Sequence, residues 1–134
     1  MNMNKHQKHM TGFSLVELMV VVFIIGLLVS IAYPSYVNQV TGAKRSDGQI
    51  GLMNASQSLE RCFTEYNAYN HANCGFAATS PEGHYAIATV SAATTFTLTA
   101  TPQATQVDPL CENLTLTSAG VQGETGAGTV DDCW

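Results

Sequence analysis

Residues 13–33 form an apolar run that constrains the fold of this chain more than any other part of its sequence. The run is 21 residues long, and Glu17 is its one charged side chain. About 20 helical residues cross the hydrocarbon core of a bilayer, so the run predicts a transmembrane helix. A carboxylate costs roughly 2.5–3.5 kcal/mol at the centre of such a helix and less near its end. We therefore expect Glu17 to have a partner of opposite charge.

The first 12 residues form a short basic leader. They carry Lys5 and Lys8 and no acidic residue, which predicts that the N-terminus stays in the cytoplasm and the rest faces outward. A cut after Gly12 would keep the apolar run in the mature chain and create a new amine at Phe13. An ordinary signal peptide is instead cut after its apolar region. An uncleaved anchor, or a signal peptide cut near Ala32, are the alternatives.

The cysteines predict an exported, disulfide-bonded domain. About 100 residues follow the apolar run, and the four cysteines are an even number. Three pairings exist. We favour Cys62–Cys74 and Cys111–Cys133, because each closes a local loop and the second ties down the end of the chain. The alternative is a zinc site, but the sequence contains no Cys-x-x-Cys pair, so we expect no metal.

The charge of the chain disfavours nucleic acid as a partner. Without Lys5 and Lys8, the net charge of −5 becomes −7, because only Lys44, Arg45 and Arg61 then stand against ten acidic residues. Basic side chains supply most of the non-specific affinity for a phosphate backbone. DNA remains a partner only if these three residues form a local patch.

Helical periodicity continues beyond the apolar run. Pro34 is expected to kink the helix, and Gly26 to weaken it. We assign Lys44, Arg45 and Asp47 to a solvated turn. From Ser46 onward, apolar residues recur at steps of three and four, which predicts an amphipathic helix that ends near residues 66–68. These residues are Leu52, Ala55, Leu59, Cys62, Phe63 and Tyr66.

Three later segments alternate between apolar and polar residues. They are residues 84–91, 94–101 and 113–118. Period-two alternation with one apolar face predicts an antiparallel sheet that is buried on one side. The glycine-rich tail from Gly120 would be mobile if Cys133 were not bonded to Cys111.

No arrangement of residues in this sequence predicts catalysis. His71 and His84 are the only histidines after the leader, and each lies in or beside a predicted loop. The chain has no Gly-x-Ser-x-Gly motif and no phosphate-binding loop. We therefore expect a protein that is not an enzyme and needs no cofactor.

The segment Gly12-Phe13-Ser14-Leu15-Val16-Glu17-Leu18 resembles the processing site of type IV prepilins, and the match continues to Pro34-Ser35-Tyr36. The resemblance implies that a prepilin peptidase cuts between Gly12 and Phe13 and N-methylates Phe13. It implies that Glu17 pairs with the Phe13 amine of a neighbouring subunit. It also implies that residues 26–34 can unwind when the helix packs into a filament.

The C-terminal half is similar to the small pilins of the PilE type, a group that includes the receptor pilin for DNA uptake sequences. The similar segments are residues 81–85, 95–102, 111–116 and 133–134. The resemblance implies an α+β type IV pilin fold, in which a long N-terminal helix with a protruding apolar half packs on a small antiparallel sheet and a disulfide ties the C-terminal loop. The expected divisions are a leader (1–12), an apolar transmembrane and filament-core helix (13–45) and a soluble head (46–134).

The resemblance implies a structural subunit of a type IV pilus, used for adhesion, twitching motility or DNA uptake. Its expected partners are other pilin subunits, the prepilin peptidase, the inner-membrane assembly platform and, before assembly, the membrane itself. The subunit is expected in the inner membrane of a Gram-negative bacterium and then in the extracellular pilus. The alternatives are a minor pilin that acts as a receptor for DNA or a surface, and a pseudopilin of type II secretion.

Overall fold

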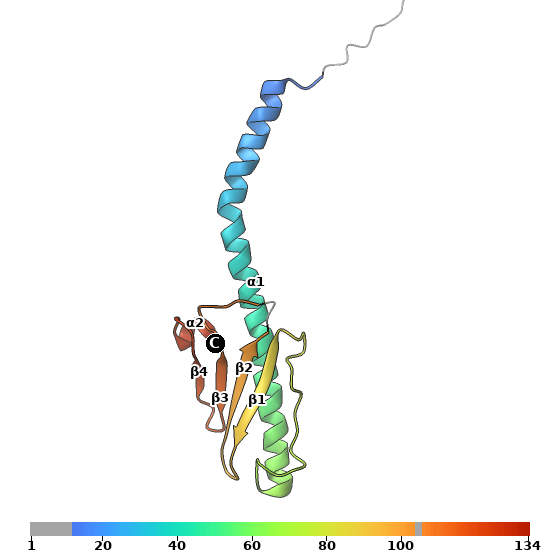
Figure 1. The fold of residues 1–134 in the computed structure, drawn as a ribbon, viewed down its shortest axis with the longest axis vertical. Helices are drawn as coiled ribbons and strands as arrows, with labels where there is room; N and C mark the ends of the chain where they lie inside the picture. The colour runs from blue at the N-terminus through green and yellow to red at the C-terminus, as the bar shows by residue number, and fades with distance from the viewer. Residues whose placement is uncertain (1–11, 104–105) are drawn as a thin grey trace, which may run out of the picture. The chain divides into compact units, whose positions relative to one another are not determined.

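The computed structural model describes residues 12–103 and 106–134 (Figure 1). The chain divides into two compact units, Met1–Val37 and Asn38–Trp134. Helix α1, Leu15–Tyr66, begins in the first unit and ends in the second. We describe each unit by itself.

The described part of the first unit is the apolar beginning of α1. Its large hydrophobic side chains are all exposed, and no part of the most apolar stretch is buried. By its length and composition, α1 is the one helix among the described residues that could cross a membrane. The helix passes without interruption through Gly26 and Pro34, so the expected weakening does not break it in the single subunit.

The second unit contains the rest of α1, a four-stranded sheet and a short C-terminal helix. The strands are β1 (Tyr85–Ser91), β2 (Phe96–Pro102), β3 (Leu114–Thr117) and β4 (Gln122–Glu124). They lie in the order β1-β2-β3-β4, and every neighbouring pair is antiparallel. Helix α2 is Val130–Cys133. The prediction of a long helix on a small antiparallel sheet is therefore confirmed.

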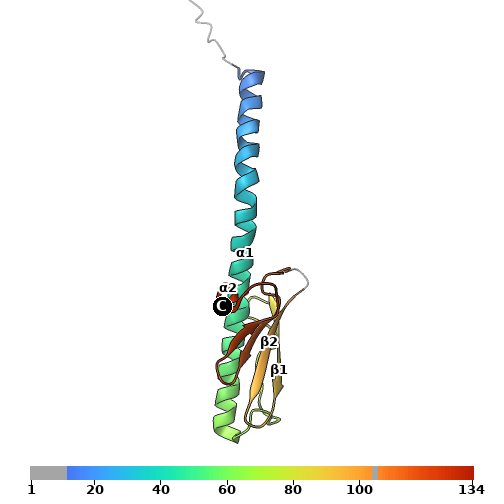
Figure 2. The same ribbon diagram turned by 90° about the vertical axis from the view of Figure 1, so that its left-hand side faces the viewer.

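The core lies between one face of the sheet and the second part of α1, which run side by side in Figure 1 and Figure 2. Alternate residues of β1, β2 and β3 point into it, as the period-two pattern predicted. Cross-strand neighbours such as Leu98 and Leu116 meet on this face. The helix contributes Leu52, Ala55 and Leu59, which are almost completely buried.

One assignment in the second unit was wrong, and one region has structure that the sequence did not predict. The assignment of Lys44, Arg45 and Asp47 to a solvated turn was wrong, because α1 continues through all three residues and Asp47 is buried. The glycine-rich tail also contains regular structure, since β4 pairs with β3 and α2 follows it. The wrong assignment on α1 arises from contacts with distant parts of the chain, whereas β4 forms by pairing with the preceding strand β3.

Helix α1 approaches β1 closely at Gly48. A Cβ atom there would lie 2.8 Å from Cδ2 and 2.9 Å from Cγ of the buried Tyr85 ring. Real Cβ atoms do not approach a ring atom this closely, so the glycine lets helix and strand meet. Gly42 differs, because a Cβ atom built on it meets nothing within 4 Å.

We predict opposite effects for alanine at these two glycines. Gly48→Ala should lower the free energy of unfolding by about 1–3 kcal/mol through overpacking against Tyr85. Gly42→Ala should raise it by about 0.5–1 kcal/mol, because alanine favours a helix over glycine. Thermal unfolding of the detergent-solubilised chain, followed by circular dichroism, measures both. Equal shifts for the two variants would contradict the close packing at Gly48.

Candidate functional site

The first candidate site is the N-terminal end of α1. Phe13 precedes the helix and its side chain is 83% exposed, while Glu17 lies in the first helical turn. Glu17 has no ion pair with any residue in the described ranges. Gly12 is the first residue described, and the rest of the predicted leader, with Lys5 and Lys8, lies outside the described residues. An apolar helix with one carboxylate is thus left available for contact with other molecules.

Asp47 joins α1 to the segment that leads into β1. Its carboxylate accepts a hydrogen bond from the Ser80 hydroxyl. It also accepts bonds from the backbone N–H groups of Glu82 (2.9 Å) and His84 (3.2 Å). Three donors compensate the burial of one carboxylate, whose residue is only 4% exposed. Residues 81–85, one of the segments that resembled small pilins, are therefore held by a charge on the helix.

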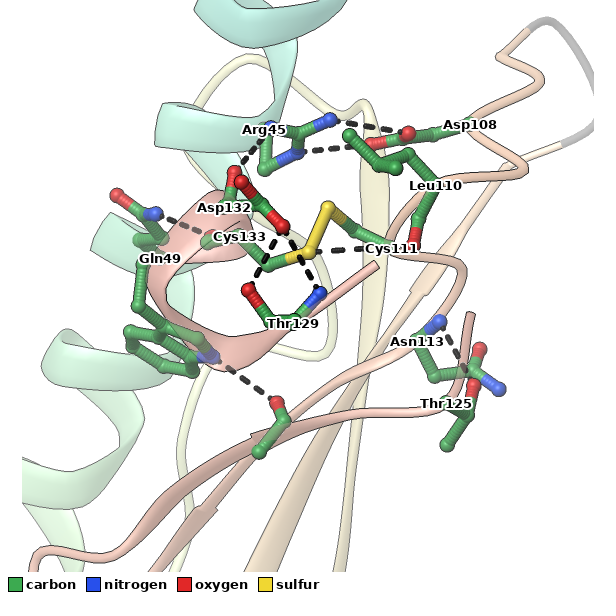
Figure 3. The surroundings of a disulfide bond; sticks show 12 residues. Arg45, Gln49, Asp108, Leu110, Cys111, Asn113, Thr125, Thr129, Asp132 and Cys133 are labelled. Atoms are coloured by element: carbon green, nitrogen blue, oxygen red, sulfur yellow. Dashed lines mark hydrogen bonds and ion pairs between the residues drawn. A yellow bond between two sulfur atoms is a disulfide. The ribbon is translucent and has the colours of Figure 1, made fainter. Parts of the chain in front are cut away.

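Arg45 joins α1 to the C-terminal region (Figure 3). Its Nε donates to Oδ2 of Asp108 at 2.9 Å, and its Nη2 donates to Oδ1 at 3.0 Å. Its Nη1 donates to the backbone oxygen of Asp132 at 2.9 Å. The hydrogen bond with Asp108 raises the pKa of the Arg45 guanidinium. A bidentate pair of this kind is among the strongest side-chain contacts in proteins.

The C-terminal disulfide lies beside this ion pair. Cys111 and Cys133 are bonded and buried, which confirms the predicted disulfide-tied C-terminal loop. Gln49 of α1 donates to the backbone oxygen of Cys133 at 2.8 Å. The Asp132 carboxylate accepts bonds from the hydroxyl and the N–H of Thr129, and these bonds lower its pKa. Residues 132–133 are therefore attached to α1 by two hydrogen bonds, from Arg45 and from Gln49.

A second disulfide and an aromatic cluster close the other end of the second unit. Cys62 near the end of α1 bonds to Cys74, the pairing that the sequence favoured. Tyr69 stacks on Phe63 and meets the ring of Phe96 edge-on. His71 stacks on Tyr66 at a ring distance of 4.0 Å. Tyr69 and His71 thus serve local packing, and the described contacts give His71 no catalytic partner.

The three basic residues that the structure describes, Lys44, Arg45 and Arg61, are not all free to bind a phosphate backbone. Arg45 is occupied by Asp108, and the side chain of Arg61 donates to Ser58 on its own helix. Lys44 is partly buried and has no ion pair among the described residues. In the same part of the chain, no group of three or more histidine, cysteine, aspartate or glutamate side chains could hold a metal ion.

Comparison with known families matches two segments of the chain. Residues 34–115 match the family described as "Type IV minor pilin ComP, DNA uptake sequence receptor". Residues 7–33 match the prokaryotic N-terminal methylation motif, which includes Gly12, Phe13 and Glu17. The chain is a member of the type IV minor pilin family.

Individual relatives agree with this assignment. The pilin is 35% identical over 130 residues to the fimbrial protein EcpC of Eikenella corrodens, covering 90% of this chain and 76% of the relative. The structure of a type IV pilin from Shewanella oneidensis is 30% identical, with a TM-score of 0.53, and the match covers 70% of this chain and 97% of that one.

A more distant structure supports the fold alone. The non-core minor pilin PilV of Neisseria meningitidis is 19% identical and has a TM-score of 0.56. The match covers 66% of this chain and 89% of PilV. The type IV pilin fold predicted from the sequence is therefore confirmed, and the relatives are structural pilins rather than enzymes.

The contact between Arg45 and Asp108 generates a stability prediction for this pilin. Arg45→Met leaves the Asp108 carboxylate, whose side chain is 1% exposed, without its partner. We expect the free energy of unfolding to fall by about 3 kcal/mol. Adding Asp108→Leu to Arg45→Met should recover most of this loss in the free energy of unfolding, because the second change removes the carboxylate that the first one left without a partner.

Lys44→Met is the matched control for this prediction, since Lys44 is the adjacent cation and has no ion pair with any described residue. Its free energy of unfolding should stay within about 0.5 kcal/mol of the wild-type value. Chemical unfolding of the four proteins in detergent measures the series. A double variant as unstable as Arg45→Met would rule out an unpaired Asp108 as the cause.

Proposed function

We propose that this pilin is a structural subunit of a type IV pilus that polymerises through the apolar part of α1. The observation that carries the proposal is the exposure of every large hydrophobic side chain between Phe13 and Val37. A surface of this size is stable only in a bilayer or against other proteins. Membership of the pilin family supports both environments, first the membrane and then the filament.

In this proposal, a prepilin peptidase removes residues 1–12 and methylates the new N-terminus at Phe13. Residues 13–45 then serve as the transmembrane and filament-core helix, and residues 46–134 as the soluble head. Before assembly, the pilin spans the inner membrane once, with its N-terminus in the cytoplasm. The assembly platform in that membrane then receives the pilin. The relatives named above are pilus or fimbrial proteins, which favours a pilus over the type II secretion pseudopilus.

Glu17 would set the position of each subunit in the filament. In apolar surroundings, the Glu17 carboxylate and the Phe13 amine of a neighbouring subunit attract strongly. Burying either charge there without its partner is energetically costly. Because Glu17 pairs with no described residue of its own subunit, its carboxylate is available for this contact. Gly26 and Pro34 are proposed to mark the stretch of helix that unwinds when subunits pack.

We predict that Glu17→Ala abolishes incorporation into pili but leaves export and processing intact. The altered residue lies outside the cut site, so a mature-sized band should still appear on an immunoblot of whole cells. The same band should be absent from pili sheared off the cells. Glu82→Gln, which removes an exposed carboxylate far along the sequence, is the control and should assemble normally. Normal amounts of the Glu17→Ala subunit in sheared pili would refute the proposed pairing.

A second candidate function is that of a DNA receptor on the pilus. The family whose description names a DNA uptake sequence receptor matches residues 34–115 and so favours it. The shortage of basic residues argues against a DNA receptor. Arg45 is paired with Asp108, and Lys44 and Arg61 are the only other basic residues after the leader.

A gel-shift assay separates the two candidates. We expect no binding of the detergent-solubilised pilin to duplex DNA at low salt, where electrostatic affinity is greatest. Tight binding that weakens as salt rises, and that Lys44→Gln or Arg61→Gln reduces, would support the receptor function. Preference for one DNA sequence over a shuffled control would show that the pilin reads bases as well as phosphates.

A further inference from the structure

The outer face of the sheet, which points away from α1, carries no charged side chain. It consists of the strand residues that alternate with the buried ones. They are Ala86, Ala88 and Val90 of β1, Thr97, Thr99 and Thr101 of β2, Thr115 and Thr117 of β3, and Gly123 of β4. Each is exposed or partly exposed. In Figure 2, α1 lies on one side of the sheet and no helix covers the other. The outer face is thus open to another molecule.

The strand pairing gives the outer face low relief. Thr99 lies at its centre, between Ala88 on one neighbouring strand and Thr115 on the other. Gly123 is the partner of Thr115 on β4, and a Cβ atom there would lie only 2.6 Å from Oγ1 of Thr115. No side chain of the face is larger than valine. A face of this kind suits the packing of a second sheet about 10 Å away.

The charge of the second unit indicates which partner suits a neutral face. This unit carries nine acidic and three basic residues. A basic partner would gain most by binding the acidic parts of the surface, so it has no need of a neutral face. Two copies of the unit repel wherever their acidic residues meet, and they can associate only where those residues are absent. The lack of charge therefore favours a second copy of this chain.

The hydroxyl groups make the outer face complementary to itself. The Thr117 hydroxyl accepts a hydrogen bond from the backbone N–H of Val121 at 3.1 Å. The other threonine hydroxyls of the outer face have no partner among the described residues. A hydroxyl both donates and accepts, so two such faces can bond to each other, whereas two faces of carboxylates cannot. Threonine methyl groups and Val90, which is 81% exposed, add apolar contact.

Symmetry decides which copies can meet in this way. A self-complementary contact relates its two partners by a two-fold axis, whereas the subunits of one filament repeat head to tail. We propose that the outer faces of subunits in two neighbouring filaments pack against each other, so that the filaments associate side by side. This inference rests on the proposed assembly of the pilin into filaments.

Sedimentation of purified filaments tests the contact. Filaments are sheared from the cells and washed free of other proteins. Low-speed centrifugation then separates bundles from single filaments, and negative-stain electron microscopy identifies both. We expect most of the wild-type pilin in the pellet at physiological salt. Purified filaments that remain single would overturn the proposal and leave the outer face to a different partner.

A charge at the centre of the outer face should prevent this association. Like charges on opposing faces repel strongly, so Thr99→Glu should lower the pelleted fraction about tenfold. Thr64→Glu adds the same charge at an exposed threonine of α1 and should leave the fraction unchanged. Equal pelleting of the two variants would overturn the role of the outer face.

The amount of sheared filament separates this inference from the proposed function. It is measured on a denaturing gel before sedimentation. Absent wild-type filaments count against the proposed function, whereas filaments that form and stay single count against this inference alone.

Thiol labelling decides the question if Thr99→Glu does not assemble. The reaction of Thr99→Cys with a maleimide is compared between bundles and filaments dispersed at low salt, where the acidic subunits repel most. We expect labelling about tenfold slower in bundles, because the core of an interface excludes water. Thr64→Cys corrects for any effect of salt on the reaction. Equal rates at position 99 in the two samples, whether fast or slow, would overturn the inference.

Discussion

The second unit depends on the pairing of two charged side chains of α1 with distant loops. Arg45 holds Asp108 and the end of the chain, and Asp47 holds the approach to β1. Hydrophobic contact alone would let the sheet slide along the helix, because apolar burial has no direction. Hydrogen bonds to fixed donors and acceptors define one position. A single turn of one helix therefore sets the register of most of the structure around it.

The same helix meets two different requirements along its length. Its first part exposes apolar side chains on all sides, as suits a bilayer or a bundle of identical helices. Its second part packs one apolar face against the sheet, and the rest of its surface is mostly polar, although Ile50 and Met53 are exposed. The acidic second unit is compatible with a secreted filament but gives subunits little electrostatic reason to associate. The apolar helix is thus the main source of assembly energy in the function that we propose.

The regular spacing of apolar residues in the sequence predicted the helix and the first three strands. The alternation in β1, β2 and β3 and the stripe through Leu52 and Leu59 place each element correctly. The charges on α1 were misassigned because the partner of Arg45 lies 63 residues away and those of Asp47 lie 33 to 37 residues away. Strand β4 has a glycine at its centre, so only its pairing with β3 reveals it.

The two disulfides also limit how far a subunit can lengthen under a pulling force. The loop closed by Cys111 and Cys133 spans a sequence separation of 22 residues, which would release about 75 Å of chain if it were free to extend. The bond holds the two Cα atoms 5.6 Å apart instead. The bond between Cys62 and Cys74 restrains a further 12 residues in the same way. A stretched subunit can therefore release chain from β1 and β2, which lie between the two bridged loops, while both loops keep their length.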